Sequence, residues 1–292
     1  MKKILLKPYV YKVVGAKKVV FYDSFNGKLY QIEKKGNLIE FIKQLKKANL
    51  IFTSKGIVPA KIKHPFFDAY LHSFLVDEIQ IRLNGKTENN CWQRLPSIVR
   101  RKKMKRRTFE KVLNEIKFIT FDVLRLECEM IEIDDLDIIV KHFPEKQIDI
   151  YVENENLTKG ESVIMSSRYA RNERIKIKRK GEVNLGTVKV DNFKFYFNQH
   201  FNPCLGRKIA IDCNGSIKPC LWINKSIGNV EKESVNELLL TKQFVPYWEL
   251  TKDKIHICSE CELRYFCDDC RIIRNNELSI YEKPFFCNYN PI

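Results

Sequence analysis

The stretch CSECELRYFCDDCR, residues 258–271, places four cysteines within fourteen positions of the chain. Cys258, Cys261, Cys267 and Cys270 follow the spacing C-x2-C-x5-C-x2-C. Cysteines this close together form disulfides, a zinc site or part of an iron–sulfur ligand set. Each alternative implies a different kind of protein, so the rest of the sequence has to decide between them.

The start of the chain argues against disulfides. The 292-residue sequence opens MKKILLKPYVYKVV, which lacks the continuous apolar stretch and the small-residue cleavage site of a secretory signal. The sequence also contains no run of about 18 apolar residues that could span a membrane. We therefore expect a cytoplasmic protein without a membrane partner, in which cellular thiols keep the cysteines reduced.

The net charge of +16 and the pI near 9.3 suit a nucleic acid, an anionic lipid or an acidic peptide as partner. The densest basic run is RRKKMKRR, residues 100–107. Apolar residues then recur at helical spacing: Phe109, Val112, Leu113, Ile116 and Ile119. We interpret the run as the basic first turn of a surface helix, with a face that docks a peptide or phosphate as the alternative. Lys, Ile and Asn are abundant throughout the chain, so the positive charge follows the overall composition and is a weak signal of a binding surface. Nucleic acid is therefore not expected as a partner.

Residues 1–70 predict a small α+β module. Strand-like stretches cover Ile4–Val14, Val19–Tyr22 and Lys28–Ile32, and the last two flank DSFNG, whose Asn26-Gly27 pair suits a tight turn. A helix is then predicted after Gly36 and Asn37, with one apolar face formed by Leu38, Phe41, Ile42 and Leu45. The segment YDSFNGKLYQI resembles the PqqD-like module that recognises leader peptides, in which a free sheet edge accepts the peptide as an added strand. The alternative is a small domain with no ligand.

The middle region alternates strand-like and helix-like segments. Strands are predicted at 76–84, 122–128 and 147–153, and helices from about 108 and at 134–143. This alternation indicates βαβ units and a mainly parallel sheet. Residues 174–198 read as β-rich and lead into the cysteine-rich region. The isolated Cys91 and Cys128 are interpreted as small buried hydrophobes.

More cysteines surround the opening stretch. Cys204, Cys213 and Cys220 precede it and Cys287 follows it, with only His200 and His256 nearby as imidazole ligands. Structural zinc sites usually pair two C-x2-C knuckles across a dozen or more residues, and the gap of five residues here is short for that. Iron–sulfur clusters take thiolates from close and remote positions together. The spacing favours iron–sulfur, with zinc as the alternative.

The positions of Cys204, Gly215, Cys220, the four close cysteines and Cys287 resemble the SPASM signature. This is the auxiliary-cluster domain of radical SAM peptide-modifying enzymes, although two residues rather than three precede Cys270. The flanking segments RKIAIDCNGSIKPC and EKPFFCNYNP are similar to the SPASM-domain peptide maturases of grasp-with-spasm systems.

The resemblance implies one or two 4Fe–4S clusters. It assigns a complete distal set to Cys258, Cys261, Cys267 and Cys287, and an incomplete proximal set to Cys204, Cys220 and Cys270. The chain has no cysteine at the family's fourth proximal position. Cys213 or His200 could complete that set, the cluster could keep an open iron, or it could be absent.

The radical SAM motif C-x3-C-x2-C is missing, because only Cys91 and Cys128 precede residue 204. We therefore expect no S-adenosylmethionine chemistry. The middle region of roughly 120 residues is also short for a complete (β/α) barrel. The expected class is α/β, with a leader-recognition module at 1–70, a trimmed radical SAM-like partial barrel at 75–197 and a SPASM iron–sulfur domain at 198–292.

The resemblance implies a role in maturing a ribosomally synthesised peptide. The chain would bind or present the precursor, through its leader, to a partner ATP-grasp ligase. Two alternatives stay open: a cluster-dependent enzyme that acts on the peptide directly, and a zinc-stapled binding protein.

Overall fold

The computed structural model describes residues 3–35, 37–54, 60–61, 76–86, 101–128, 131–152, 173–179, 188, 190–268, 270–271, 279–284 and 287–292. The chain divides into two compact units, and each combines segments that are far apart in the sequence. The first unit contains Met1–His72, Asn184–Gly206 and Glu249–Ile292, and the second contains Ser73–Val183 and Arg207–Trp248. Cys91 lies outside the described residues.

The first unit contains a three-stranded antiparallel sheet in the order β2 (Val10–Val14), β3 (Lys18–Asp23), β4 (Lys28–Glu33). The predicted hairpin between β3 and β4 is confirmed, and its turn ends at Gly27 with φ of 64°. A side chain at this φ would be strained, which is why glycine suits the position. β2 and β4 are the two edges of this sheet.

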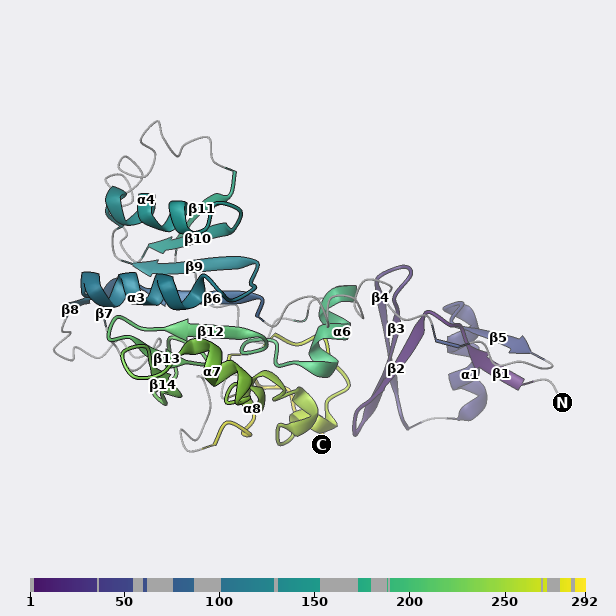
Figure 1. Cartoon of the computed structure of the whole chain (residues 1–292). Helices are drawn as coiled ribbons and strands as arrows, with labels where there is room; N and C mark the ends of the chain where they lie inside the picture. The colour runs from purple at the N-terminus through teal and green to yellow at the C-terminus, as the bar shows by residue number, and fades with distance from the viewer. Residues whose placement is uncertain are drawn as a thin grey trace. The chain divides into compact units, whose positions relative to one another are not determined.

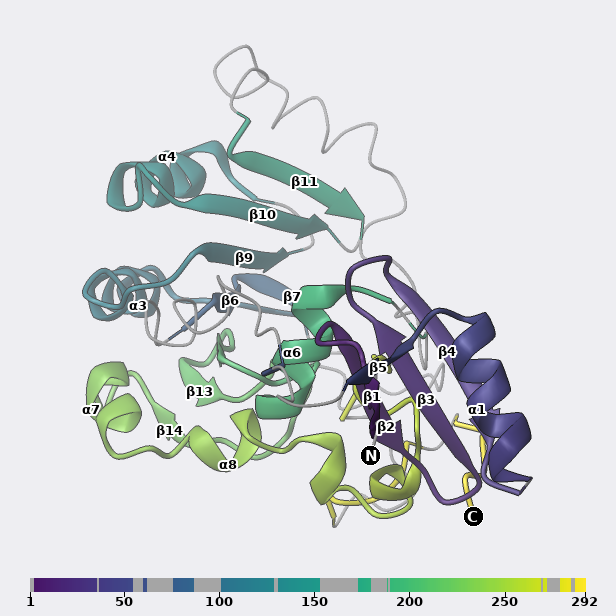
Figure 2. The same ribbon diagram turned by 90° about the vertical axis from the view of Figure 1, so that its right-hand side faces the viewer.

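The predicted helix is confirmed as α1 (Leu38–Lys47), which lies beside β4 in Figure 2. It begins where the Asn37 side chain accepts a 2.9 Å hydrogen bond from the Ile39 backbone N–H. The predicted strand at 4–14 proves to be two strands, because β1 (Lys3–Leu6) leaves β2 and pairs with β5 (Ile51–Ser54). One face of the three-stranded sheet packs in a core with the helix region, formed by Val10, Val19, Phe21, Leu45 and Leu50.

The opposite face of the same sheet packs against later parts of the chain. Val13, Val20 and Tyr22 form a core with Phe195 and Phe266. Phe195 belongs to α6 (Asn192–His200), so the expectation of β structure through residue 198 is wrong. FKFYFN alternates like a strand, but the Asp191 side chain caps a helix by accepting from the Lys194 backbone N–H at 2.8 Å. Tertiary packing of the aromatic side chains then overrides the local pattern.

The second unit contains a seven-stranded sheet among the described residues, in the order β11-β10-β9-β6-β12-β13-β14. Its parallel strands are β6 (Glu78–Arg82), β9 (Val123–Cys128), β10 (Gln147–Val152), β11 (Ile175–Arg179) and β12 (Lys208–Ile211). β13 (Ser216–Lys218) and β14 (Gly228–Asn229) add antiparallel strands at one edge. The prediction of an α/β fold with a large parallel sheet is confirmed.

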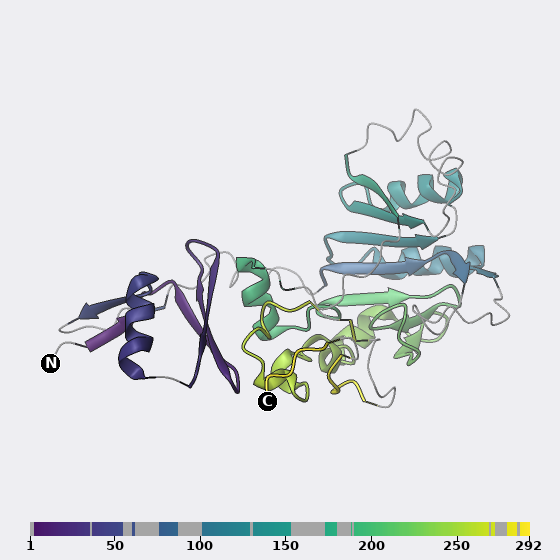
Figure 3. The same ribbon diagram turned by 180° about the vertical axis from the view of Figure 1, so that it is seen from behind.

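Two crossover helices connect these strands. α3 (Arg106–Ile116) and α4 (Ile133–His142) follow β6 and β9, and both lie on the same side of the sheet (Figures 1 and 3). A short antiparallel pair, β7 (Asn84–Lys86) with β8 (Arg101–Lys103), precedes α3. The basic run therefore spans a strand and the start of a helix, rather than only a helical turn.

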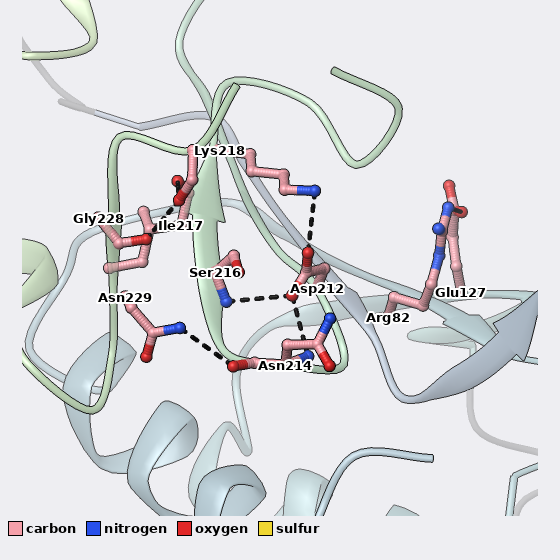
Figure 4. Close-up of polar contacts among 10 residues, drawn as sticks. Arg82, Glu127, Asp212, Asn214, Ser216, Ile217, Lys218, Gly228 and Asn229 are labelled. Atoms are coloured by element: carbon pink, nitrogen blue, oxygen red, sulfur yellow. Dashed lines mark hydrogen bonds and ion pairs between the residues drawn. The ribbon is translucent and has the colours of Figure 1, made fainter. Parts of the chain in front are cut away.

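Side chains alternate between the two faces of the parallel sheet. One set is apolar and fully buried, for example Ile79, Leu124 and Ile148. Cys128 belongs to this set at 0% exposure, which confirms that it is a buried hydrophobe. The other set is charged, and Arg82 Nη2 donates to Glu127 Oε2 at 3.1 Å (Figure 4).

The cysteine-rich region contributes to both units. β12, β13, and the helices α7 (Val235–Leu240) and α8 (Val245–Trp248) belong to the second unit, whereas residues 249–292 belong to the first. The partial barrel and the three predicted domains stay predictions. Among the described residues, no helix is both long and apolar enough to cross a membrane.

Candidate metal centre

Four of the predicted ligands line one pocket in the first unit. Cys258, Cys261, Cys267 and Cys287 all contribute to its wall, and we call it the thiol pocket. Its empty volume is about 400 Å³, part of which is open to solvent. These are the cysteines of the distal set that the SPASM resemblance implies. The structure therefore brings together residues separated by up to 29 positions (287 − 258).

Residues 258–267, which we call the cysteine loop, supply three of these thiols through a series of tight turns. The loop begins with a single 3-10 turn, η2 (Cys258–Glu260), in which the Cys261 backbone N–H donates to the Cys258 carbonyl at 3.0 Å. Phe266 N–H donates to the Leu263 carbonyl at 2.9 Å in the next turn. Turns of this size explain how cysteines three and six positions apart reach the same pocket.

Polar side chains hold the cysteine loop in place. The Arg264 guanidinium donates from Nη1 to the carbonyls of Cys261 at 3.0 Å and Val14 at 2.9 Å. Its Nε donates to Asp253 Oδ1 at 2.7 Å. The buried Asn198 on α6 donates from Nδ2 to the Tyr265 carbonyl at 2.9 Å. The loop is thus fixed from β2, from α6 and from η1 (Lys252–Lys254).

The wall of the thiol pocket is cationic as well as sulfur-rich. Lys252, Arg264 and Lys283 line it together with the thiols. Lys283 Nζ donates to the Tyr289 carbonyl at 2.8 Å, which places its charge at the pocket wall. Thiolate ligands are negatively charged, so cations in the wall favour the ligand form of the cysteines.

Burial first, and then the neighbouring charges of Glu262, Cys267 and Cys258, raise the pKa of the Cys261 thiol to about 12. Without a metal this thiol therefore keeps its proton at neutral pH. Metal binding requires the thiolate, so the proton must leave when the ligand bond forms.

The donor set fits an iron–sulfur cluster. Four thiols from close and remote positions share one pocket, and iron–sulfur clusters are held by four thiolates in this way. Among the described residues, no three His, Cys, Asp or Glu side chains are arranged to hold a single metal ion.

The other predicted ligands divide between the units. Cys204 and Cys270 belong to the first unit, where the Asn202 side chain accepts from the Cys204 backbone N–H at 2.9 Å. Cys213 and Cys220 belong to the second unit, and His200 ends α6 in the first. The proximal ligand set therefore stays a prediction.

Cys213 lies on the predicted turn between β12 and β13. Gly215 has φ of 77°, and Asp212 Oδ1 accepts from the backbone N–H groups of Asn214 at 2.9 Å and Ser216 at 3.1 Å (Figure 4). Lys218 Nζ pairs with Asp212 Oδ2 at 2.9 Å. The turn is built by these groups, and Cys213 itself is buried.

The thiol pocket and the turns around it agree with one comparison of the sequence with protein families. Residues 204–262 match SPASM, an iron–sulfur cluster-binding domain. The SPASM match begins at the first ligand of the implied proximal set and ends directly after Cys261. It covers only the first part of the cysteine-rich region and ends before Cys267, Cys270 and Cys287. No curated protein matches the chain.

Solved structures give weaker likenesses. BtrN in complex with AdoMet and 2-DOIA is 14% identical, with 69% of this chain and 96% of BtrN covered and a TM-score of 0.41. Streptococcus suis SuiB bound to precursor peptide SuiA is 10% identical, with 92% and 96% covered and a TM-score of 0.40. Native anSMEcpe with bound AdoMet is 10% identical, with 72% and 93% covered and a TM-score of 0.34. All three scores are below 0.5, so these likenesses carry no argument about this chain.

A second candidate site lies on the N-terminal sheet. An open groove runs between the sheet and α1, with an empty volume of about 1280 Å³ that includes open solvent, and we call it the N-terminal groove. Its apolar lining includes Val19, Ile32 and Phe41, and its charged lining includes Lys12 and Lys34. Leu38 lines the groove and is 69% exposed, so the groove offers apolar surface to a partner.

The sequence analysis missed one residue of the metal centre, Glu262. It follows Cys261 directly, is 0% exposed and accepts hydrogen bonds at Oε1. Its donors, Gln31 and Tyr289, lie 231 and 27 positions away in the sequence. The only local signal was a carboxylate inside a cysteine loop, where surface exposure is the ordinary expectation.

Proposed function

We propose that this chain holds a 4Fe–4S cluster on Cys258, Cys261, Cys267 and Cys287 and presents a ribosomal precursor peptide to a partner ATP-grasp ligase. The observation that carries the cluster assignment is the convergence of these four thiols on one pocket. The SPASM match over residues 204–262 supports the same chemistry. When bound, the cluster supplies one-electron redox capacity and joins the cysteine loop to the C-terminal segment.

Metal and sulfide analysis of anaerobically prepared protein tests the cluster. We expect iron and acid-labile sulfide in equal amounts, and loss of both in Cys261→Ala. Cys128→Ala is the matched control, because Cys128 is buried in β9 of the other unit and should leave the iron content unchanged. Zinc without sulfide would reject the cluster in favour of the zinc-stapled alternative.

The peptide-binding role rests on the N-terminal groove. β4 is an edge strand of its sheet and lines the groove, so an extended peptide can pair with its backbone. The apolar lining and the lysines suit a leader that combines apolar and acidic residues. The net charge of +16 would speed the encounter with such a leader and make binding sensitive to salt.

Point variants in the full chain test docking better than a truncation. Removing residues 1–64 would expose Phe195 and Phe266, because Tyr22 packs against both. We expect Leu38→Glu to weaken binding of a labelled precursor peptide at least tenfold. Leu240→Glu is the control, since Leu240 is 78% exposed on α7 of the other unit. Equal affinity of both variants and the wild type would reject the groove as the docking site.

The ligase partnership follows from the grasp-with-spasm resemblance. In a reconstituted reaction, the partner ATP-grasp ligase should modify the precursor faster when the chain is present. Leu38→Glu should remove the stimulation. Equal rates with and without the chain would reject presentation as its role, and modification of the precursor by the chain alone would favour the direct-enzyme alternative.

A further inference from the structure

One carboxylate oxygen connects the N-terminal groove with the thiol pocket. Gln31 on β4 borders the groove, but its side chain projects from the opposite face of the sheet, beside Val20, where Nε2 donates to Glu262 Oε1 at 2.5 Å. Tyr289 lines the thiol pocket, and its hydroxyl donates to the same oxygen at 2.5 Å. Glu262 is fully buried and adjacent to Cys261 in the chain. The two sites therefore share a hydrogen-bond acceptor.

The surroundings of Glu262 leave little freedom for independent movement. The Ala16 backbone N–H donates to the Glu260 carbonyl at 2.8 Å, and Arg264 Nη1 donates to the Val14 carbonyl at 2.9 Å. These bonds fasten the β2–β3 hairpin to the cysteine loop. Glu262 Oε2 lacks a hydrogen-bond partner in the described part of the chain, so Oε1 carries the polar contacts of this buried group.

A change at one donor must therefore affect the other. If a peptide pairs with the backbone of the edge strand β4 and shifts that strand, the Gln31 side chain on its other face moves too, and Glu262 Oε1 keeps only the Tyr289 hydroxyl as donor. A buried carboxylate that loses a donor is costly, so Glu262 and Tyr289 would readjust together. Tyr289 is two residues from Cys287, whose Sγ lies 3.9 Å from the Tyr289 carbonyl oxygen. The readjustment would thus reach a thiol of the pocket.

We infer that Glu262 couples occupancy of the N-terminal groove by an extended peptide to the cluster environment in the thiol pocket. The inference rests on the proposed function, which supplies both the cluster and the peptide. Coupling of this kind is reciprocal, so the state of the cluster also changes the affinity of the groove for the peptide. Glu262 acts here as a positioning residue.

The test compares variants of the two donors in cluster-loaded, full-length protein. Gln31→Ala removes the donor on the groove side, and Tyr289→Phe removes the donor on the pocket side. Gln44→Ala is the matched control, because Gln44 lines the same groove from α1 without a hydrogen bond from its side chain to Glu262. The readouts are the electron paramagnetic resonance spectrum of the reduced cluster and the rate of iron loss to a chelator.

Without peptide, we expect Gln31→Ala and Tyr289→Phe each to change the spectrum and to accelerate iron loss several-fold. The variant that carries both substitutions should lose iron only slightly faster than the more affected single variant, because both substitutions act through the same oxygen. Gln44→Ala should match the wild type. With a synthetic leader of the precursor peptide, the wild type and Gln44→Ala should show a spectral change that Tyr289→Phe lacks.

The possible failures are distinguishable. A cluster-loaded Gln31→Ala protein identical to Gln44→Ala, or strictly additive single effects, would overturn the coupling and leave the proposed function intact. If Gln31→Ala does not fold, the test relies on Tyr289→Phe alone. A spectral change on adding the leader that equals the wild-type change in Tyr289→Phe would then overturn the coupling. Wild-type protein without iron overturns the proposed cluster and the coupling together.

Discussion

Gly15 lies directly against Glu262. A Cβ added at Gly15 would come within 2.6 Å of the backbone N and of Oε2 of Glu262, and within 2.9 Å of the Glu260 carbonyl oxygen. Two of these three atoms are backbone and cannot rotate away. Gly15→Ala should therefore force the β2–β3 hairpin away from the cysteine loop and destabilise the first unit by about 1–3 kcal/mol. Denaturant unfolding, followed together with iron content, measures the effect.

Gly27→Ala is the matched control for this prediction. Gly27 has φ of +64° and no atom within 4 Å of an added Cβ, so the substitution costs only backbone strain. We expect a loss of about 1–2 kcal/mol from the left-handed conformation and no loss of iron. The prediction for Gly15 is contradicted if Gly15→Ala retains wild-type iron content and stability.

The second prediction concerns the buried pair of Arg82 and Glu127 in the other unit. Their side chains are 4% and 3% exposed, and Arg82 also lies over the Trp222 ring at 4.3 Å from its centroid. Replacing one partner leaves a buried charge uncompensated, so Glu127→Leu should destabilise the protein by about 3–5 kcal/mol.

The double variant Arg82→Met with Glu127→Leu separates charge compensation from packing. It should be more stable than either single variant, because both charges of the pair are removed, while Arg125, which also contacts Glu127, keeps its ion pair with Glu78. Denaturant unfolding of the three variants and the wild type completes the cycle. Additive losses in the double variant would show that the two residues stabilise the sheet independently.

Local signals explain which parts of the fold could be predicted. The β3–β4 hairpin depends on Gly27, and α1 depends on the Asn37 cap, so a few neighbouring residues specify each. α6 could not be predicted in this way, because its aromatic residues gain their helical packing from Tyr22 and Phe266, far away in the chain. Likewise, no local signal assigns β12 to the sheet of β6, since that pairing joins residues about 130 positions apart.

The candidate metal centre shows the same division. The resemblance to the SPASM signature implied the set Cys258, Cys261, Cys267 and Cys287, and the structure places all four at one pocket. Their environment was not predictable. Glu262 gains its role from Gln31, which belongs to a different element and lies 231 positions away in the sequence. Hydrogen bonds of this kind are specified by the folded arrangement, and periodicity carries no trace of them.

A third prediction follows from the missing radical SAM motif. A cluster that activates S-adenosylmethionine needs three cysteines in C-x3-C-x2-C spacing, and only Cys91 and Cys128 precede residue 204. Cys128 is 0% exposed within β9. With a strong reductant, the cluster-loaded protein should therefore form no 5′-deoxyadenosine above a protein-free blank. Product above the blank that disappears in Cys261→Ala would contradict this prediction.

The last prediction concerns the pH dependence of stability through Glu78 on β6. Burial by itself raises the pKa of this carboxyl, but Lys208 and Arg125, with a hydrogen bond from Gln80, hold the pKa below its usual 4.5. Lys208 Nζ and Arg125 Nη1 each lie 3.7 Å from a Glu78 oxygen, and Gln80 Nε2 donates at 2.6 Å. The folded state therefore prefers ionised Glu78 more than the unfolded state does.

A lowered pKa stabilises the fold above the unfolded-state pKa, and the stabilisation is lost as the pH falls through the folded-state pKa. The stability difference between the wild type and Glu78→Gln should thus be constant from pH 7 down to about 5 and shrink at lower pH. Lys208→Met removes one of the charges that lower the pKa, so its background should show a smaller decline. Urea unfolding at each pH of the wild type, Glu78→Gln, Lys208→Met and the variant with both substitutions measures these free energies. A stability advantage of the wild type over Glu78→Gln that grows on acidification would show that Glu78 is protonated in the folded state.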